Sequence, residues 1–197
     1  GGISAKILRF IKGQEGFAMY PWYFSGESFR TGGYGITENY QSKYFELLGK
    51  APYSEKTATE ILVQMINSEF ASALYYRMLK DGLVAKDIKQ QHFDAFVSLA
   101  MNGGMGAVIS SPMYKKYLVN QNDTTIYDSW LTWYVRGENG IVLQGLVTRR
   151  KQEAEMFKNG VYEYKPITVY GMSGNATGTV TENNGNGYIP NTVNGEV

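Results

Sequence analysis

Glu15-Gly16-Phe17 is the first of two stretches that decide the fold of this chain. The second is Thr31-Gly32-Gly33-Tyr34-Gly35, which begins sixteen residues after Glu15. Apolar residues recur at helical spacing from Ile3 to Gln14, which predicts an amphipathic helix that ends near Gly13 or Gly16. Residues 17–40 are dense in aromatic residues and Gly, and this composition predicts a twisted hairpin or three short strands. Glu15 is therefore expected at the lip of a cleft, between a helix end and a small sheet.

Beyond residue 50 the apolar pattern is helical. A candidate cap at Ser54 precedes a long pattern that continues to Leu74, and we expect this helix to connect two lobes. Further helices are expected over residues 93–101, 112–119, 124–135 and 143–157. After about Tyr164 the composition shifts to Gly, Asn and Thr without a period, so this segment cannot form a core of its own. Residues 1–163 are predicted to form one domain, and residues 164–197 a linker or extension toward another module.

The overall composition is that of a soluble globular protein. The 197 residues are 43% hydrophobic and 19% charged, with a mean hydropathy of -0.31, and a chain of this size can bury a core. There is no run of about 18 apolar residues, which excludes a transmembrane helix and direct membrane insertion. The first residues lack the basic and apolar regions of a signal peptide. A net charge of +1 does not supply the long-range attraction that nucleic-acid binding needs.

The residue types also exclude several kinds of catalytic site. The chain has no cysteine, so disulfides, thiolate catalysis and zinc–thiolate sites are ruled out. His92 is the only histidine, which makes a Ser-His-Asp triad or a histidine-based zinc site hard to build. The helical pattern around His92 predicts a surface or boundary position. We therefore expect no metal and no organic cofactor.

Carboxyl chemistry remains, and Glu15 is its main candidate. Hydrolysis of a glycosidic bond needs an acid to protonate the departing oxygen and a second group, commonly a carboxylate, to activate water. Half-burial at a cleft would raise the pKa of Glu15 and suit it to the first role. Glu27 is the further acidic candidate in the loop, and the Thr31 hydroxyl can hold a water. A Glu before a Gly is also common at a solvated helix terminus, so this signal alone leaves both interpretations open.

Four segments, taken together and in order, resemble the phage-type lysozymes, a family of glycoside hydrolases. They are Glu15-Gly16-Phe17 with Tyr20; Thr31-Gly32-Gly33-Tyr34-Gly35; Gln91 to Ala100 with Asn102, Gly103 and Gly106; and Gln144-Gly145-Leu146 with Arg149, Arg150, Glu153 and Phe157. The resemblance covers roughly residues 3–160. It implies an α+β, lysozyme-like catalytic domain with a small three-stranded β lobe and a mainly helical lobe joined by a long helix.

The resemblance also implies an activity. Glu15 falls on the catalytic acid and Thr31 on the threonine that positions the attacking water. The expected reaction is hydrolysis, with inversion, of the β-1,4 bond between N-acetylmuramic acid and N-acetylglucosamine in peptidoglycan. The family's Asp is missing, however, because its spacing counted from either end lands on Phe24 or Ser25. Glu27 is the nearest acidic residue, and it either replaces that Asp or is a solvated turn residue.

Further residues are candidates for substrate binding. Tyr20 and Tyr34 belong to an aromatic group from which some rings are expected to stack on sugars and most to pack in the core. The resemblance adds Asn102, and it implies that either Arg149 or Arg150 reaches toward Glu15 while the other is structural. Trp130, Trp133 and Tyr134 are expected in the core of the helical lobe.

Two other functions fit the same residues. The missing Asp and the C-terminal segment favour a weakly catalytic or non-catalytic cell-wall-binding domain of a phage tail, and a lytic transglycosylase would also use one Glu. The expected partners are peptidoglycan and, through the C-terminal segment, other phage tail proteins. The expected location is the virion tail, or the host cytoplasm and cell wall.

Overall fold

The computed structural model describes residues 2–193, which fall into two compact units. Unit 1 contains the residues up to Ile7 and Ser68–Glu163, and unit 2 contains Leu8–Asn67 and Tyr164–Val193. The chain passes from one unit to the other within α1 (Ala5–Glu15), within the π-helical segment η2 (Ile66–Ala71) and after Glu163. The residues of unit 2 are thus drawn from both ends of the sequence.

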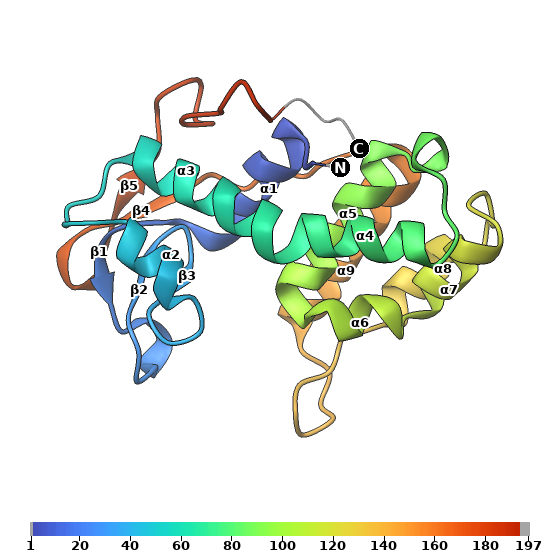
Figure 1. Cartoon of the computed structure of the whole chain (residues 1–197). Coiled ribbons are helices and arrows are strands. Elements are labelled where there is room, and N and C mark those ends of the chain that lie inside the picture. The colour runs from blue at the N-terminus through green and yellow to red at the C-terminus, as the bar shows by residue number, and fades with distance from the viewer. Residues whose placement is uncertain (1, 194–197) are drawn as a thin grey trace. The chain divides into compact units, whose positions relative to one another are not determined.

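Unit 2 is built on a five-stranded sheet with the order β3-β2-β1-β4-β5 (Figure 1). The strands are β1 (Phe17–Trp22), β2 (Thr31–Gly33), β3 (Ile36–Thr37), β4 (Thr168–Tyr170) and β5 (Ala176–Thr179). Neighbouring strands pair antiparallel except β1 and β4, which are parallel, with Phe17 opposite Val169. The three strands expected over residues 17–40 are present. The expectation of a three-stranded sheet is wrong, because residues 168–179 add two strands.

The C-terminal segment is a part of unit 2 as far as Val193. Ile167 and Val180 are fully or almost fully buried on either side of the β4–β5 hairpin. A strand needs a backbone partner and a few apolar side chains rather than a core of its own, and the edge of β1 provides that partner. The further role of residues 164–197, as a connection to another module, stays a prediction.

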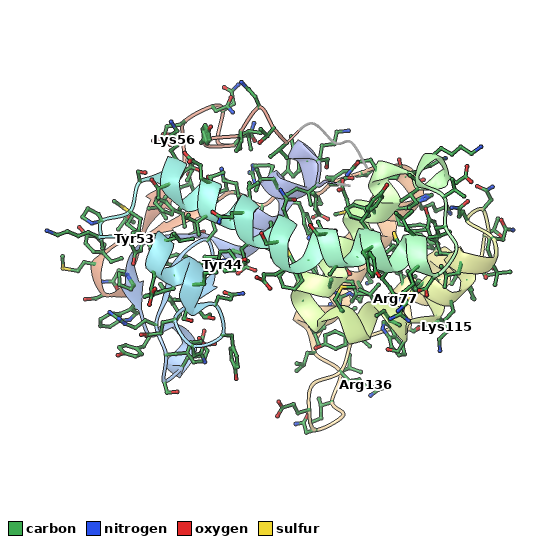
Figure 2. The ribbon with its side chains drawn as sticks, viewed as in Figure 1. Tyr44, Tyr53, Lys56, Arg77, Lys115 and Arg136 are labelled. Atoms are coloured by element: carbon green, nitrogen blue, oxygen red, sulfur yellow. The ribbon has the colours of Figure 1, made fainter. Side chains whose placement is uncertain are left out.

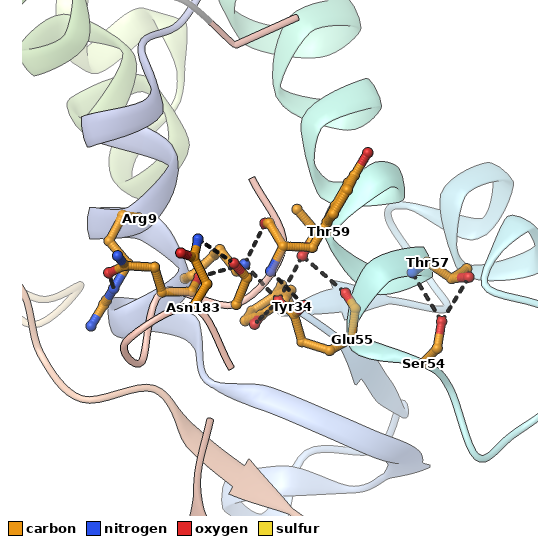
Figure 3. A network of polar contacts seen from close by, with 11 residues as sticks. Arg9, Tyr34, Ser54, Glu55, Thr57, Thr59 and Asn183 are labelled. Carbon is orange, nitrogen blue, oxygen red and sulfur yellow. Dashed lines mark hydrogen bonds and ion pairs between the residues drawn. The ribbon is translucent and has the colours of Figure 1, made fainter. Parts of the chain in front are cut away.

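A buried ion pair ties this segment to the helices of unit 2 (Figure 3). Lys12 Nζ lies 2.6 Å from Glu55 Oε1 and donates to the carbonyl oxygens of Asn186 and Tyr188 at 2.9 Å each. Glu55 also accepts hydrogen bonds from the Tyr188 amide at 2.8 Å and the Tyr34 hydroxyl at 2.9 Å. Burial acts to raise the pKa of Glu55, but the bonds from Lys12 and Tyr188 outweigh it and hold the pKa below its usual value. The buried charges are therefore well partnered, as such pairs must be.

The long helical segment begins where the sequence predicts. Ser54 caps α3 (Glu55–Met65) by accepting the Thr57 amide at 3.0 Å. Tyr53, labelled in Figure 2, is buried just before it, and Gly32 of β2 lies so close that a Cβ there would be 2.9 Å from the Tyr53 ring. The helical backbone continues through η2 into α4 (Ser72–Lys80). The short α2 (Ser42–Leu47) precedes it in unit 2.

Unit 1 is helical and has an aromatic core. After α4, its main helices are α5 (Gln90–Gly103), α6 (Met105–Ile109), α7 (Pro112–Val119), α8 (Ile126–Thr132) and α9 (Gln144–Asn159). The centroid of the Phe96 ring lies 5.3–5.7 Å from those of Tyr114, Tyr117, Trp130 and Phe157. Edge and tilted contacts of this kind stabilise the packing beyond the area they bury. Arg77, labelled in Figure 2, pairs with Asp81, which also accepts the Tyr114 hydroxyl and so links α4 to α7.

Two expectations for unit 1 are wrong. His92 is 7% exposed rather than a surface or boundary residue, because its ring stacks on Phe157 and its Nδ1 lies 3.0 Å from the Tyr117 hydroxyl. Tyr134 is 39% exposed, since α8 ends before it and its φ is 51°. Trp130 is fully buried as expected, and Trp133 is half-buried. Within residues 2–193, no helix is both long and apolar enough to cross a membrane.

Candidate active site

Glu15 stands where α1 meets the sheet of unit 2. The Gly16 amide donates to the Lys12 carbonyl oxygen at 2.9 Å, and Gly16 then takes a φ of 71°. This left-handed conformation is the usual way for a glycine to end a helix. β1 follows at Phe17, so Glu15 is the last residue of the helix and lies one residue before the first strand. The side chain is exposed, and the expectation that it is half-buried is wrong.

The turn between β2 and β3 leaves room for the Glu15 carboxyl. Gly35 in this turn has a φ of 71°, which favours glycine, and a Cβ at this position would overlap the Glu15 carboxyl. The predicted Thr31-Gly32-Gly33-Tyr34-Gly35 motif therefore has two roles. Its first residue opens β2, and its last glycine lies directly against Glu15.

Glu15 lines a pocket of about 360 Å³ in unit 2. The pocket is lined by Glu15, Gly16, Ala18, Phe24, Ser25, Glu27, Phe29, Thr31, Gly33, Gly35, Thr37 and Tyr170. The structure thus brings Glu15, Thr31 and Glu27, the catalytic residues expected from the sequence, to one pocket. All of the lining residues belong to unit 2.

The sheet supplies two rows of residues to this pocket. In one row, Thr37 of β3 lies opposite Thr31 of β2. In the other, Gly33 of β2 lies opposite Ala18 of β1, which in turn lies opposite Tyr170 of β4. Residues paired across adjacent strands share a face of the sheet. The hydroxyls of Thr31 and Thr37 in the first row line the pocket. In the second row, Gly33 and Ala18 have little or no side chain and so leave space for the pocket.

The loop between β1 and β2 carries Glu27. It includes the short 3-10 helix η1 (Phe24–Gly26), and Glu27 follows with its amide donating to the Phe24 carbonyl oxygen at 3.1 Å. Glu27 is exposed. Phe24 and Ser25, where the family's spacing would place an Asp, line the same pocket. The aspartate position is therefore occupied by an aromatic ring and a hydroxyl, with Glu27 as the second carboxyl of the pocket.

The loop is fastened where it enters β2. The Arg30 guanidinium donates two hydrogen bonds, of 3.0 and 3.2 Å, to the Glu38 carboxylate, which also accepts one from the Arg30 amide. The Glu38 amide donates to the Arg30 carbonyl oxygen at 3.0 Å. The bidentate contact with Arg30 lowers the pKa of Glu38. Thr31 comes directly after this clamp, so its position in the pocket is well defined.

The two aromatic candidates differ in their surroundings. Tyr34 is fully buried, and its hydroxyl donates a hydrogen bond to the Glu55 carboxylate. The centroid of its ring lies 5.5 Å from that of Phe17. The prediction that Tyr34 binds substrate is therefore wrong, because the ring has no exposed face. Tyr20 is half-buried in β1 and does not line the pocket.

The candidates on α5 and α9 belong to unit 1. Arg150 is fully buried, and its guanidinium donates two hydrogen bonds, of 2.5 and 2.9 Å, to the Glu153 carboxylate. This contact gives Arg150 a structural role. Arg149 is 8% exposed, and its Nε lies 3.0 Å from Ser98 Oγ and 3.4 Å from Glu153 Oε2. Asn102 is exposed near the end of α5. The roles of Arg149 and Asn102 in substrate binding stay predictions.

The chemistry available in the pocket is that of carboxyls and hydroxyls. Among residues 2–193, no three or more His, Asp or Glu side chains cluster in a way that could hold a metal ion. The pocket lining contains neither Lys nor Arg. Such a site can exchange protons with a neutral ligand and position a water.

Comparison with known proteins agrees with this arrangement. The sequence profile described as phage lysozyme matches residues 12–153, which is most of the chain. The chain belongs to the phage lysozyme family. This chain is similar to the endolysin of Bacillus phage B103, with 41% identity over 80 residues, or 41% of this chain and 29% of that protein. This chain spans less than a third of the length of the curated relatives that it matches.

Solved phage lysozymes have the same fold. The endolysin of Escherichia coli O157:H7 phage FAHEc1 superimposes with a TM-score of 0.65 at 25% identity, covering 83% of this chain and 97% of that one. A mutant of P22 lysozyme does so with a TM-score of 0.58 at 20% identity, covering 80% of this chain and 98% of that one. The α+β, lysozyme-like fold class and the family resemblance are confirmed.

Tyr170 lines the pocket but was not among the site residues predicted from the sequence. It lies in β4, beyond the residues that the family profile matches. Sequence analysis assigned this part of the chain to a linker. Only its pairing with Ala18 of β1 shows that it belongs to the pocket.

Proposed function

We propose that this protein is a peptidoglycan hydrolase that cleaves the β-1,4 bond between N-acetylmuramic acid and N-acetylglucosamine. The observation that carries the proposal is that Glu15, Thr31 and Glu27 line one pocket in a chain of this family. Glycoside hydrolysis requires an acid and a group that activates or positions water. A pocket with two carboxyls and several hydroxyls provides both.

In the proposed reaction, Glu15 donates its proton to the glycosidic oxygen as the bond to the anomeric carbon breaks. A water held by the Thr31 hydroxyl attacks that carbon from the opposite face and gives up a proton, so the configuration inverts. Glu27 is the candidate to accept this proton, since it is the other carboxyl that lines the pocket. Loss of a general acid typically costs a factor of about 10² to 10⁴ in rate.

The test is the loss of turbidity of a peptidoglycan suspension with matched variants. Glu15→Gln is expected to lower the rate by at least about 100-fold, and Glu27→Gln is expected to lower it by a smaller factor. Glu46→Gln is the control, because Glu46 is an exposed residue of α2 that does not line the pocket. Full lytic activity of Glu15→Gln would refute the proposal.

The products distinguish hydrolysis from lytic transglycosylation. Hydrolysis adds water and leaves a reducing N-acetylmuramic acid, whereas transglycosylation leaves an anhydro end. Mass spectrometry of the released fragments is expected to show the hydrated product. Proton NMR of the first product formed is expected to show the inverted anomer.

A second candidate function is cell-wall binding without efficient catalysis, as part of a phage tail. It is favoured by Phe24 and Ser25 standing where the family pattern has an Asp. A wild-type protein that sediments with peptidoglycan but causes no loss of turbidity would support this function. Detection of the protein in purified virions would support the location in the tail.

A further inference from the structure

The β4–β5 hairpin contributes to the wall of the pocket that contains Glu15. Tyr170, at the end of β4, is half-buried, lines the pocket and lies opposite Ala18 of β1. Its ring also lies against Gly16, where a Cβ would come within 2.8 Å of Tyr170 Cε2. Gly16 directly follows Glu15, so Tyr170 adjoins the backbone that places the candidate acid.

Aromatic side chains continue from Tyr170 toward the outer end of β1. The Phe24 ring, which also lines the pocket, meets Tyr170 edge to face with centroids 5.3 Å apart. Trp22 and Tyr23 precede it with ring centroids 6.2 Å apart, and they are 39% and 48% exposed. The partly exposed rings of Trp22 and Tyr23 thus adjoin the rings of Phe24 and Tyr170, which line the pocket.

The turn of the hairpin is shaped to the rings of β1 and η1. Gly174, in the short 3-10 helix η4 (Met172–Gly174), has a φ of 74°. A Cβ on Gly174 would lie 2.5 Å from Trp22 Cδ1 and 3.2 Å from Phe24 Cε1. The hairpin therefore packs directly against both rings and restricts their motion. Rings fixed in advance bind a ligand at a lower entropic cost.

We propose that Tyr170, Phe24 and Trp22 form a sugar-binding subsite that extends the Glu15 pocket along the β4–β5 hairpin. This inference rests on the proposed function and names an additional substrate contact outside residues 12–153, which the family profile matches. Sugar rings carry apolar C–H faces that stack on aromatic rings, and their hydroxyl and acetamido groups form hydrogen bonds with hydroxyl and carboxyl groups. The pocket lining is aromatic, hydroxylic and acidic and lacks basic residues, which fits a glycan rather than an anionic ligand.

The test separates binding from catalysis. Tyr170→Ala is expected to raise KM for soluble peptidoglycan fragments about three- to tenfold, the effect of one aromatic contact, with kcat changed less than twofold. Tyr170→Phe keeps the ring and is expected to keep KM within twofold of wild type. Tyr76→Ala is the control, because Tyr76 is a 69% exposed aromatic residue of α4 in unit 1. Trp22→Ala, which removes a ring exposed on the surface, is expected to raise KM in the same way and does not depend on the stability of Tyr170→Ala.

A binding assay makes the result independent of turnover. In a Glu15→Gln background, isothermal titration calorimetry with N-acetylglucosamine oligomers measures binding without a tryptophan reporter, and Tyr170→Ala and Trp22→Ala are each expected to weaken this binding by the same three- to tenfold. An unchanged KM and an unchanged affinity in both Tyr170→Ala and Trp22→Ala would overturn the subsite. Failure of the proposed function gives a different result, because wild type would then be as inactive as Glu15→Gln whatever the oligomer affinities are.

Discussion

The single histidine makes the stability of unit 1 depend on pH by a predictable amount. Burial, together with the positive charge of Lys89, lowers the pKa of His92 from 6.5 to about 4. The unfolded chain therefore binds a proton near pH 6 that the folded chain does not bind. The free energy of unfolding is expected to fall as the pH falls from about 6.5 to about 4. The pKa difference of about 2.5 units, at about 1.4 kcal/mol for each unit, corresponds to about 3.5 kcal/mol, of which about 3 kcal/mol is lost by pH 4, where the folded imidazole is half protonated.

The measurement compares the wild-type side chain with His92→Phe. The phenyl ring keeps a stack on Phe157, which lies 4.1 Å from the imidazole centroid, and it does not titrate. Both proteins carry Trp22→Phe, so that the remaining tryptophans, Trp130 and Trp133, report on unit 1 alone. Urea unfolding followed by fluorescence between pH 7 and pH 4 is expected to show that the His92 protein loses about 3 kcal/mol more than the Phe protein.

The same reasoning can be checked directly by NMR, since one histidine gives one imidazole signal. Its titration midpoint is expected near pH 4. A midpoint near 6.5, or parallel stability curves for the two proteins, would show that the environment of His92 does not disfavour the imidazolium and would refute the argument.

Two further substitutions in unit 2 test the site and its support. Gly35→Ala is expected to lower the free energy of unfolding by about 1 kcal/mol because of the positive φ. It is also expected to lower lytic activity at least about tenfold, since the new Cβ displaces the Glu15 carboxyl. Full lytic activity of Gly35→Ala would show that the close approach of residue 35 to the Glu15 carboxyl is unimportant. Lys12→Met leaves the Glu55 carboxylate without its buried cation and is expected to destabilise the fold by about 3–5 kcal/mol in urea unfolding. Adding Glu55→Gln to Lys12→Met is expected to restore part of that loss, and a single variant within about 1 kcal/mol of wild type would contradict the role of the pair.

Features that depend on neighbours in sequence were predicted well. Ser54 caps the helix that starts at Glu55, and Pro112 opens a helix with the predicted bounds 112–119. Gly16 ends the first helix beside Glu15. A cap, a proline at a helix start and a closing glycine each act within one turn of the backbone, so their signals are local.

Features that depend on distant partners were missed. Strands β4 and β5 form in a segment with few apolar residues because β4 pairs with the edge of β1 and β5 pairs in turn with β4. Tyr34 is buried where its hydroxyl donates a hydrogen bond to Glu55, and Arg150 is buried where its guanidinium donates to the carbonyl oxygen of Tyr134. Neither partner can be identified from composition or periodicity. Tyr170 escaped notice for the same reason, since only the pairing of remote strands brings it to the pocket.

The parallel pairing of β1 with β4 has a consequence for synthesis of the protein. During translation β1 leaves the ribosome early, and Ser68–Glu163 must all emerge before β4 does. Until then one edge of β1 is unpaired, and such edges invite association with other chains. Closing so long a loop is slow. The nascent polypeptide therefore completes its central sheet among the last steps of folding. A chain truncated before Thr168 would keep an unpaired edge on β1 and would be prone to aggregate.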